Sequence, residues 1–93
     1  MSYVYVLKSL TDSNLYIDST IDLKRRFVEH NAGKVKSTKE RIPFELVYYE
    51  SYKSESDARK REHNLKLRSR AFEQLKKRIH DSLNSNNEPQ DVK

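Results

Sequence analysis

The stretch from residue 15 to residue 30 constrains the fold most, because it reads as a strand, a tight turn and an amphipathic helix. Apolar and polar residues alternate from 15 to 18, which is the period of a half-buried strand. Ser19 is a suitable helix cap, and Leu23 and Phe27 then lie one helical turn apart. The pattern predicts a strand that leads directly into a helix with one apolar face.

The same two periods predict the other elements. Residues 2–8 alternate and pair with residues 14–18 as an antiparallel hairpin, because turn-forming residues separate them. Residues 44–52 are apolar on both faces, which indicates a third strand buried between layers. Three helices are expected over residues 21–32, 54–67 and 69–79, with Ser54 and Ser69 as caps of the last two and Gly33 ending the first.

These elements predict a small α/β (α+β) domain, in which a three-stranded antiparallel sheet is flanked by about three helices. The domain is expected to span residues 1–80. Residues 81–93 are rich in polar residues and nearly free of apolar ones, so a disordered polar tail is expected there.

Composition narrows the functional classes. The chain of 93 residues has no cysteine, which excludes disulfides and thiolate metal sites. It has no apolar run of signal-peptide or membrane-spanning length, so we expect a cytoplasmic protein without a membrane partner. The formal net charge is +5, and residues 59–78 hold nine basic and two acidic residues. That local excess favours a nucleic-acid partner over a merely solvated helix face.

Five side chains are candidates for catalysis or metal binding. Tyr5 and Tyr16 lie on predicted strands, and Arg26 and His30 are four residues apart on a predicted helix. Glu62 interrupts the apolar face of the next helix, where a carboxylate is costly unless it is paired, hydrogen-bonded or bound to metal. Each also has an ordinary explanation, because tyrosines pack at sheet edges and glutamates pair along helices. We expect the five side chains to converge on one concave surface.

Several short motifs appear in a fixed order. Tyr3-Val4-Tyr5 precedes Tyr16-Ile17-Asp18, and Asp22-Leu23-Lys24-Arg25-Arg26 precedes His30. The segments Arg41–Tyr48 and Lys60-Arg61-Glu62 follow. In this order and spacing the chain resembles the GIY-YIG nuclease superfamily, most closely its small single-domain bacterial members, over residues 2–79.

The resemblance implies hydrolysis of DNA phosphodiester bonds with Mg²⁺ or Mn²⁺. It implies that Glu62 binds the metal ion, that Arg26 holds a phosphate oxygen and that Tyr5 activates the attacking water. Tyr16 would position or assist, and His30 would hydrogen-bond a tyrosine or relay a proton. We expect a monomer that recognises the backbone and shape of branched or nicked DNA. The basic residues expected to contact DNA are Arg25, Lys34, Lys36, Lys39, Arg41, Lys66 and Arg68.

The chain departs from the family pattern at Asp18, where the family has the glycine of its YIG motif. A carboxylate there adds negative charge near the expected phosphate, and it could alternatively supply a second metal ligand. Three functions stay open on the residues alone. They are an active endonuclease, a nucleic-acid-binding module that has lost cleavage through Asp18, and a protein-interaction domain, against which the local basic charge argues.

Overall fold

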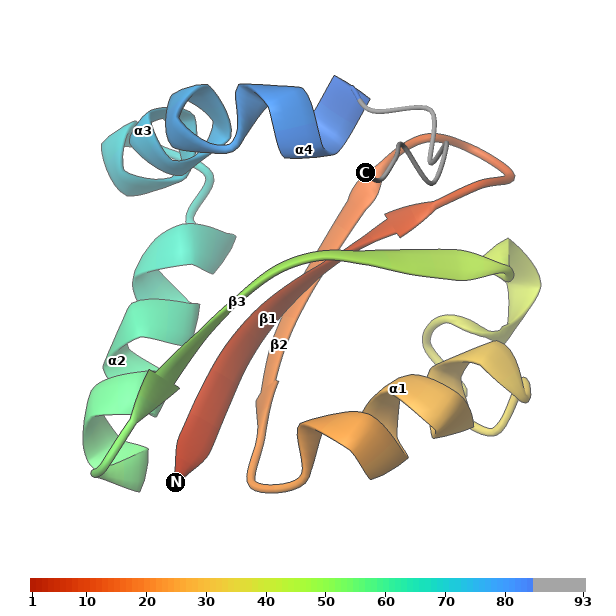
Figure 1. Cartoon of the computed structure of the whole chain (residues 1–93), viewed down its shortest axis with the longest axis horizontal. Coiled ribbons are helices and arrows are strands. Elements are labelled where there is room, and N and C mark those ends of the chain that lie inside the picture. Colours follow the sequence, from red (N-terminus) through yellow and green to blue (C-terminus); the bar gives the residue numbers. More distant parts are fainter. Residues whose placement is uncertain (85–93) are drawn as a thin grey trace, which may run out of the picture.

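The computed structural model describes residues 1–84. Three antiparallel strands form one sheet in the order β2-β1-β3 (Figure 1), so β1 is the central strand. The strands are β1 (Ser2–Ser9), β2 (Leu15–Thr20) and β3 (Phe44–Tyr52). This sheet confirms the predicted fold class and the predicted hairpin.

The helices are distributed over both faces of the sheet. Helix α1 (Leu23–Asn31) covers one face, while α2 (Glu55–Lys66) and α3 (Arg70–Arg78) cover the other (Figure 1). A short 3-10 helix, η1 (Lys39–Arg41), lies in the loop after α1, and α4 (His80–Asn84) follows α3. The fourth helix was not predicted.

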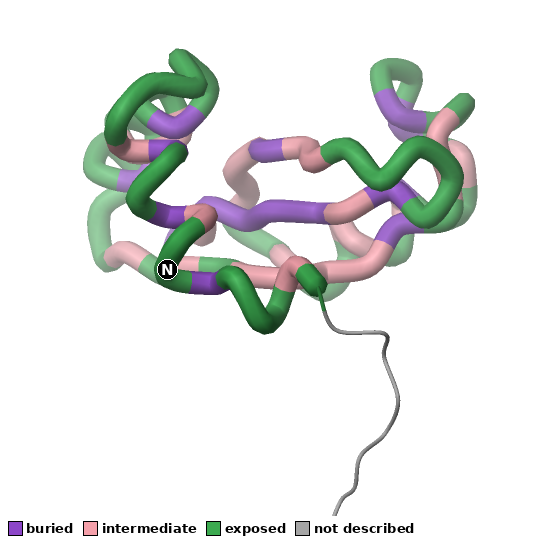
Figure 2. Tube along the Cα trace, turned by 90° about the horizontal axis from the view of Figure 1, so that it is seen from above, coloured by how far each residue is buried: buried purple, intermediate pink, exposed green. Residues whose placement is uncertain are grey.

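The alternation along β1 produces two hydrophobic clusters. Val4 and Val6 point to the face covered by α2 and α3, whereas Tyr5 and Leu7 point to the face covered by α1. All four side chains are buried, and Figure 2 shows that burial is concentrated along the central strand. Successive side chains of β1 therefore point to opposite faces of the sheet, in agreement with the predicted period of two.

The start of α1 differs from the prediction. Ser19 belongs to β2, and the helix cap is Asp22, whose side chain accepts a hydrogen bond from the backbone N–H of Arg25 at 3.1 Å. Ser54 and Ser69 do occupy the cap positions of α2 and α3, but neither side chain makes a capping hydrogen bond.

The predicted polar tail overlaps a helix. Residues 81–84 belong to α4, where Leu83 packs against the core and its carbonyl accepts a hydrogen bond from Lys8 Nζ at 2.7 Å. The rest of the predicted tail, residues 85–93, lies outside the described residues. Within residues 1–84, no helix is long and apolar enough to cross a membrane.

A hydrogen-bonded ion pair joins β3 to α2. The carboxylate of Glu50 accepts hydrogen bonds from Tyr48, Tyr52 and Arg61, with the Arg61 contact at 2.9 Å. Both charged side chains are largely buried, at 14% and 26% exposed. Burial acts to raise the pKa of Glu50, but the bonds from Arg61 and the two tyrosines outweigh it and lower the pKa. The ionised pair therefore stabilises the fold above the ordinary carboxyl pKa, and this stabilisation is lost as the pH falls through the lowered value.

Replacing Glu50 with alanine is expected to lower the free energy of unfolding by about 2 kcal/mol, because Arg61 is left without its partner. For a domain of this size the midpoint of thermal unfolding should fall by roughly 10 °C at neutral pH. Glu55→Ala is the matched control, since its pair with Arg59 is exposed on both sides and should change the midpoint little. Equal midpoints for the two variants would contradict this account of the pair.

Candidate active site

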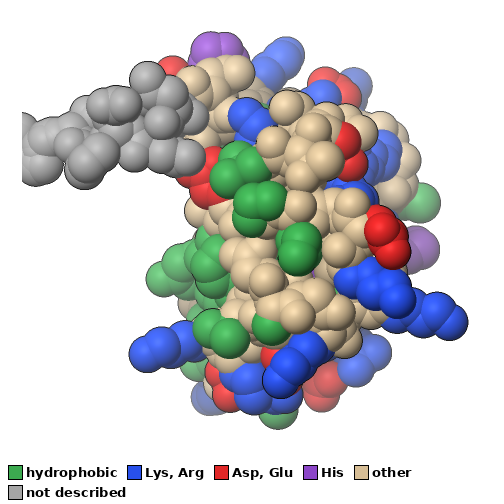
Figure 3. Space-filling view, turned by 90° about the vertical axis from the view of Figure 1, so that its right-hand side faces the viewer, with side chains coloured by type: hydrophobic (Ala, Val, Ile, Leu, Met, Phe, Trp, Pro, Cys, Tyr) green, Lys and Arg blue, Asp and Glu red, His purple; other side chains and the backbone are tan. Residues whose placement is uncertain are grey.

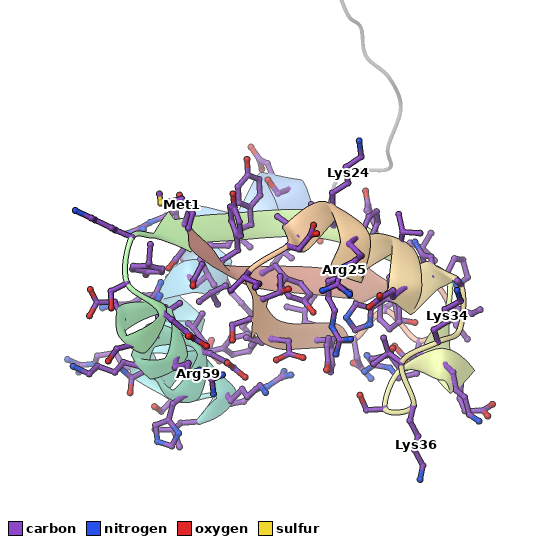
Figure 4. The ribbon with its side chains drawn as sticks, turned by 90° about the horizontal axis from the view of Figure 1, so that it is seen from below. Met1, Lys24, Arg25, Lys34, Lys36 and Arg59 are labelled. Atoms are coloured by element: carbon purple, nitrogen blue, oxygen red, sulfur yellow. The ribbon has the colours of Figure 1, made fainter. Side chains whose placement is uncertain are left out.

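The predicted site residues come from both faces of the sheet and approach one another at the outer edge of β2. Asp18 pairs with Tyr5 in the strand register, so its side chain lies on the α1 face. Ser19 pairs with Val4 and lies on the α2 face, where it contacts Glu62. Figure 4 shows α2 and α1 on either side of this edge. The side chains thus flank the edge of a strand rather than sharing one sheet face.

Tyr5 and His30 form a buried hydrogen-bonded pair. The Tyr5 hydroxyl lies 2.8 Å from His30 Nε2, and His30 Nδ1 lies 2.8 Å from the hydroxyl of Thr38. None of the three residues has exposed surface. Burial raises the pKa of Tyr5 well above its usual range, with a further contribution from Asp18, while Arg26 acts in the opposite direction. Burial and the charge of Arg26 lower the pKa of His30, so its imidazole is neutral at neutral pH.

Asp18 lies near the end of β2, where hydrogen-bond donors and two cations surround its carboxylate. Its carboxylate accepts hydrogen bonds from the Tyr16 hydroxyl at 2.9 Å and from the Ser19 backbone N–H at 2.8 Å. Arg26 Nη2 lies 4.0 Å from the same carboxylate, and Lys66 Nζ lies 3.9 Å from it. Asp18 is therefore in contact with or close to three groups that can bind a phosphate.

Glu62 is the second carboxylate at this edge. It accepts hydrogen bonds from the Ser19 hydroxyl and from Lys66 Nζ, the latter at 2.6 Å, and its side chain is 18% exposed. Burial acts to raise the pKa of Glu62, but Lys66 and Ser19 outweigh burial and lower it. The ammonium of Lys66 thus lies close to both Glu62 and Asp18, and this contact is the link between the two sides of the edge.

A divalent metal ion fits this donor set only as a sparsely ligated ion. Within residues 1–84, no cluster of three or more histidine, cysteine, aspartate or glutamate side chains has the arrangement of a metal site. Glu62 is nevertheless ionised and reachable by solvent, and the Ser19 hydroxyl is beside it. Mg²⁺ is commonly held by one or two carboxylates with water and substrate oxygens completing its shell. Glu62 is thus compatible with Mg²⁺, provided that Lys66 moves from the carboxylate.

Some of the predicted DNA-binding residues are exposed, whereas others already form ion pairs within the protein. Lys34, Lys36 and Lys39 are exposed in the loop after α1. Arg25 pairs with Glu29 at 2.9 Å, while Arg41 is held by Asp12 at 2.8 Å. In Figure 4, Arg25 and Lys36 point to the side where β2 forms the sheet edge, and Lys24 points to the opposite side. Figure 3, which views the molecule from the right-hand side of Figure 1, shows basic side chains around most of the margin of that face.

Three contacts were not identified from the sequence. Thr38 hydrogen-bonds to His30, Ser37 lies 3.5 Å from the Tyr16 hydroxyl, and Ser19 bonds to Glu62. Serine and threonine in these segments read as turn and cap residues, so no local pattern indicates these contacts. The signal that could have found Ser19 is its position two residues after Ile17, on the buried face of the same strand.

Comparisons with known proteins agree with the resemblance. The model of the GIY-YIG catalytic domain matches residues 1–78. A UPF0213 protein of Natronomonas pharaonis is 49% identical over 70 residues, which cover 74% of this chain and 81% of that protein. A UPF0213 protein of Staphylococcus haemolyticus is 45% identical over 69 residues, covering 73% and 83%. The solution structure of a UPF0213 protein from Bacillus halodurans superimposes with a TM-score of 0.55 at 29% identity, covering 94% of this chain and 97% of the other.

Proposed function

Since the chain belongs to the GIY-YIG family, we propose that it is an endonuclease that hydrolyses DNA phosphodiester bonds with a divalent metal ion, Mg²⁺ or Mn²⁺. The observation that carries the proposal is the approach of Tyr16, Arg26 and Glu62 to one edge of β2. The proposal includes branched or nicked DNA as the substrate and a cytoplasmic monomer as the active form. The exposed lysines of the loop after α1 would contact the DNA backbone.

Arg26 would bind the negatively charged phosphate of the substrate, and Glu62 would bind the positively charged metal ion. The Arg26 side chain is 32% exposed, and its guanidinium makes one long contact with Glu29 at 3.4 Å and another with Asp18 at 4.0 Å. It would exchange these contacts for a phosphate, to which it can donate two parallel hydrogen bonds. Glu62 would hold the metal ion, which when bound stabilises negative charge on the leaving oxygen. Lys66 would then leave Glu62 and remain near the phosphate.

Tyr5 and His30 would move the proton of the attacking water. Thr38 donates its hydroxyl hydrogen toward the Val35 carbonyl at 3.4 Å, so His30 Nδ1 donates to Thr38 and Nε2 accepts from Tyr5. The Tyr5 proton can pass to His30 Nε2 as the Tyr5 oxygen takes a proton from water. Because the raised pKa of Tyr5 excludes a free phenolate at neutral pH, the two transfers must be coupled.

Asp18 favours a second candidate function, a nucleic-acid-binding module with weak or absent cleavage. Its carboxylate accepts the Tyr16 hydroxyl hydrogen and lies near both Arg26 and Lys66, which are groups that a phosphate would contact. A bound phosphate would meet this negative charge. Two unit charges about 4 Å apart repel by roughly 1–4 kcal/mol between water and a partly exposed site.

Replacing Asp18 with glycine is expected to raise Mg²⁺-dependent cleavage at least tenfold, because about 1.4 kcal/mol removed from the barrier is tenfold in rate. DNA binding should also tighten. The measurement is single-turnover cleavage of branched, nicked and linear duplexes by the parent and the variant, across a series of Mg²⁺ concentrations. Asp18→Asn is the matched variant, since it removes the charge while keeping an acceptor for Tyr16, and it should be intermediate.

The Mg²⁺ series separates the two roles of Asp18. If Asp18 is a metal ligand beside Glu62, the glycine variant will be slower and will need more Mg²⁺, which would contradict the inhibitory role. If none of the three proteins cleaves any duplex but all bind DNA, the binding-module function replaces the nuclease. Absence of DNA binding by the parent would contradict both functions.

A further inference from the structure

A cavity lies beside the start of β2, at the end of the strand opposite to Asp18. It has a volume of about 280 Å³ and is bounded by the β1–β2 hairpin and by helices α3 and α4. Lys8, Arg68 and Lys76 line it, together with Ser13 and Asn14 of the hairpin turn. No carboxylate belongs to the described residues that line it. The cavity therefore combines three positive charges with polar side chains, which suits a small anion.

The cations around the cavity are fixed in place but keep unused donors. Arg68 Nη2 donates to the Leu15 carbonyl at 3.1 Å, and its guanidinium lies 4.6 Å from the centre of the Phe72 ring. Lys76 Nζ lies 5.0 Å from the same ring. A guanidinium carries five N–H donors, and the described residues accept only one bond from Arg68. Lys76 also pairs with Glu73 at 3.4 Å, whose side chain is 59% exposed.

The backbone around the cavity is in an unusual conformation. Ser13 and Arg68 have φ angles of 65° and 58°, and they are the two non-glycine residues with positive φ within residues 1–84. Both line the cavity. Arg68 follows the end of α2, where its N–H donates to the Leu65 carbonyl, a position at which glycine is usual. Side chains are kept in such strained positions mainly at functional sites, so an arginine here points to a use for its guanidinium.

We propose that this cavity binds a backbone phosphate of the nucleic acid, on the same strand as the phosphate at the candidate active site; the proposal rests on the proposed function. The last residue of α2 and the turn after it supply a cation to each place, because Lys66 reaches Asp18 and Arg68 reaches Leu15. Asp18 follows Leu15 by three positions along β2, a rise of about 10 Å. One strand of a duplex carries a phosphate for every ~3.4 Å of axis length, so a single strand can supply a phosphate to both places.

The test compares two double variants that remove the same charge. Arg68→Gly with Lys76→Gln empties the cavity of two cations, and glycine adopts the φ of residue 68 without strain. Lys24→Gln with Lys53→Gln removes two exposed lysines that do not line the cavity. Duplex affinity is measured against salt concentration without metal. The slope of log affinity against log salt should fall by about two for the cavity pair and by less than half a unit for the control pair.

Inorganic phosphate provides a second arm, followed through the NMR signals of the Ser13 and Asn14 amides. Saturable shifts in the parent that vanish in the cavity variant support an anion site there. Equal salt slopes for the two variants, in a parent that binds duplex, would overturn the cavity assignment alone. Failure of the parent to bind duplex would instead contradict the proposed function. If phosphate still shifts the amides in that case, the cavity takes a free anion, and the nucleic-acid assignment is overturned.

Discussion

Glu62→Gln is expected to reduce Mg²⁺-dependent cleavage by at least about a hundredfold while leaving DNA affinity unchanged or slightly higher. Glutamine keeps the size of the side chain and an acceptor for Ser19, but it removes the negative charge. A metal ion in such a site contributes several kcal/mol of transition-state stabilisation, and about 1.4 kcal/mol is tenfold in rate. Cleavage rates and duplex affinity, the latter measured without metal, give the two quantities.

The expected separation of cleavage from binding follows from the contacts of Glu62. Its carboxylate accepts hydrogen bonds from Lys66 at 2.6 Å and from Ser19, and both groups can donate to another anion once the charge is gone. Removing the charge therefore frees a cation for the DNA backbone. Loss of cleavage and of binding together would indicate that Glu62 acts only by organising this edge.

Glu55→Gln is the control for the same helix. Its side chain is 58% exposed, and among residues 1–84 it pairs only along α2, with Arg59. Cleavage by this variant should stay within about twofold of the parent, since exposed ion pairs contribute little. A Glu62→Gln protein that cleaves as fast as the control in Mg²⁺ would rule out Glu62 as the metal ligand.

The sheet could be predicted because its evidence is local. Val4 and Val6 alternate with Tyr5 and Leu7, and the structure places the two pairs in different clusters, as a period of two requires. The inner face of α2 was also visible, because Leu65 recurs two turns after Ala58 and both are buried. In each case burial on one face repeats along a single element, so no distant contact has to be known.

The start of α1 could not be predicted in the same way. Ser19 and Asp22 both have the chemistry of a helix cap, and local preference does not decide between them. The structure decides because Glu62, which is 43 residues away in the sequence, accepts the hydroxyl hydrogen of Ser19 and keeps it in the strand. Helix α4 was missed for a related reason, since Leu83 is its one apolar side chain and its packing is tertiary.

The candidate site was only partly visible in the sequence. The family resemblance supplied Tyr5, Tyr16 and Glu62, and the contact of Tyr16 with Asp18 follows from their spacing of two on one strand face. The sequence could not indicate that Tyr5 is fully buried, because this depends on how α1 and the loop after it cover the sheet. Nor could it indicate that Lys66 lies near both carboxylates.

The burial of Tyr5 makes the two tyrosines experimentally distinguishable. Tyr5 has no exposed surface, whereas Tyr16 is half-buried and donates to Asp18. If Tyr5 is the base, a water reaches its hydroxyl only after Arg26, whose guanidinium lies beside it, turns toward a phosphate. If Tyr16 is the base, the water is reached directly, and Tyr5 only holds His30 in position.

Tyr5→Phe is expected to reduce cleavage by at least about a hundredfold, the range for loss of a general base, and Tyr16→Phe by clearly less. Both changes remove one hydroxyl and keep the ring, so each variant is the control for the other. The rate should also fall in acid as His30 becomes protonated, because an imidazolium cannot accept the Tyr5 proton. The lowered pKa of His30 places this fall below the ordinary range of histidine. A rate that depends on Tyr16 and not on Tyr5, with no acid limb, would assign the water to Tyr16 and leave Tyr5 and His30 as positioning residues.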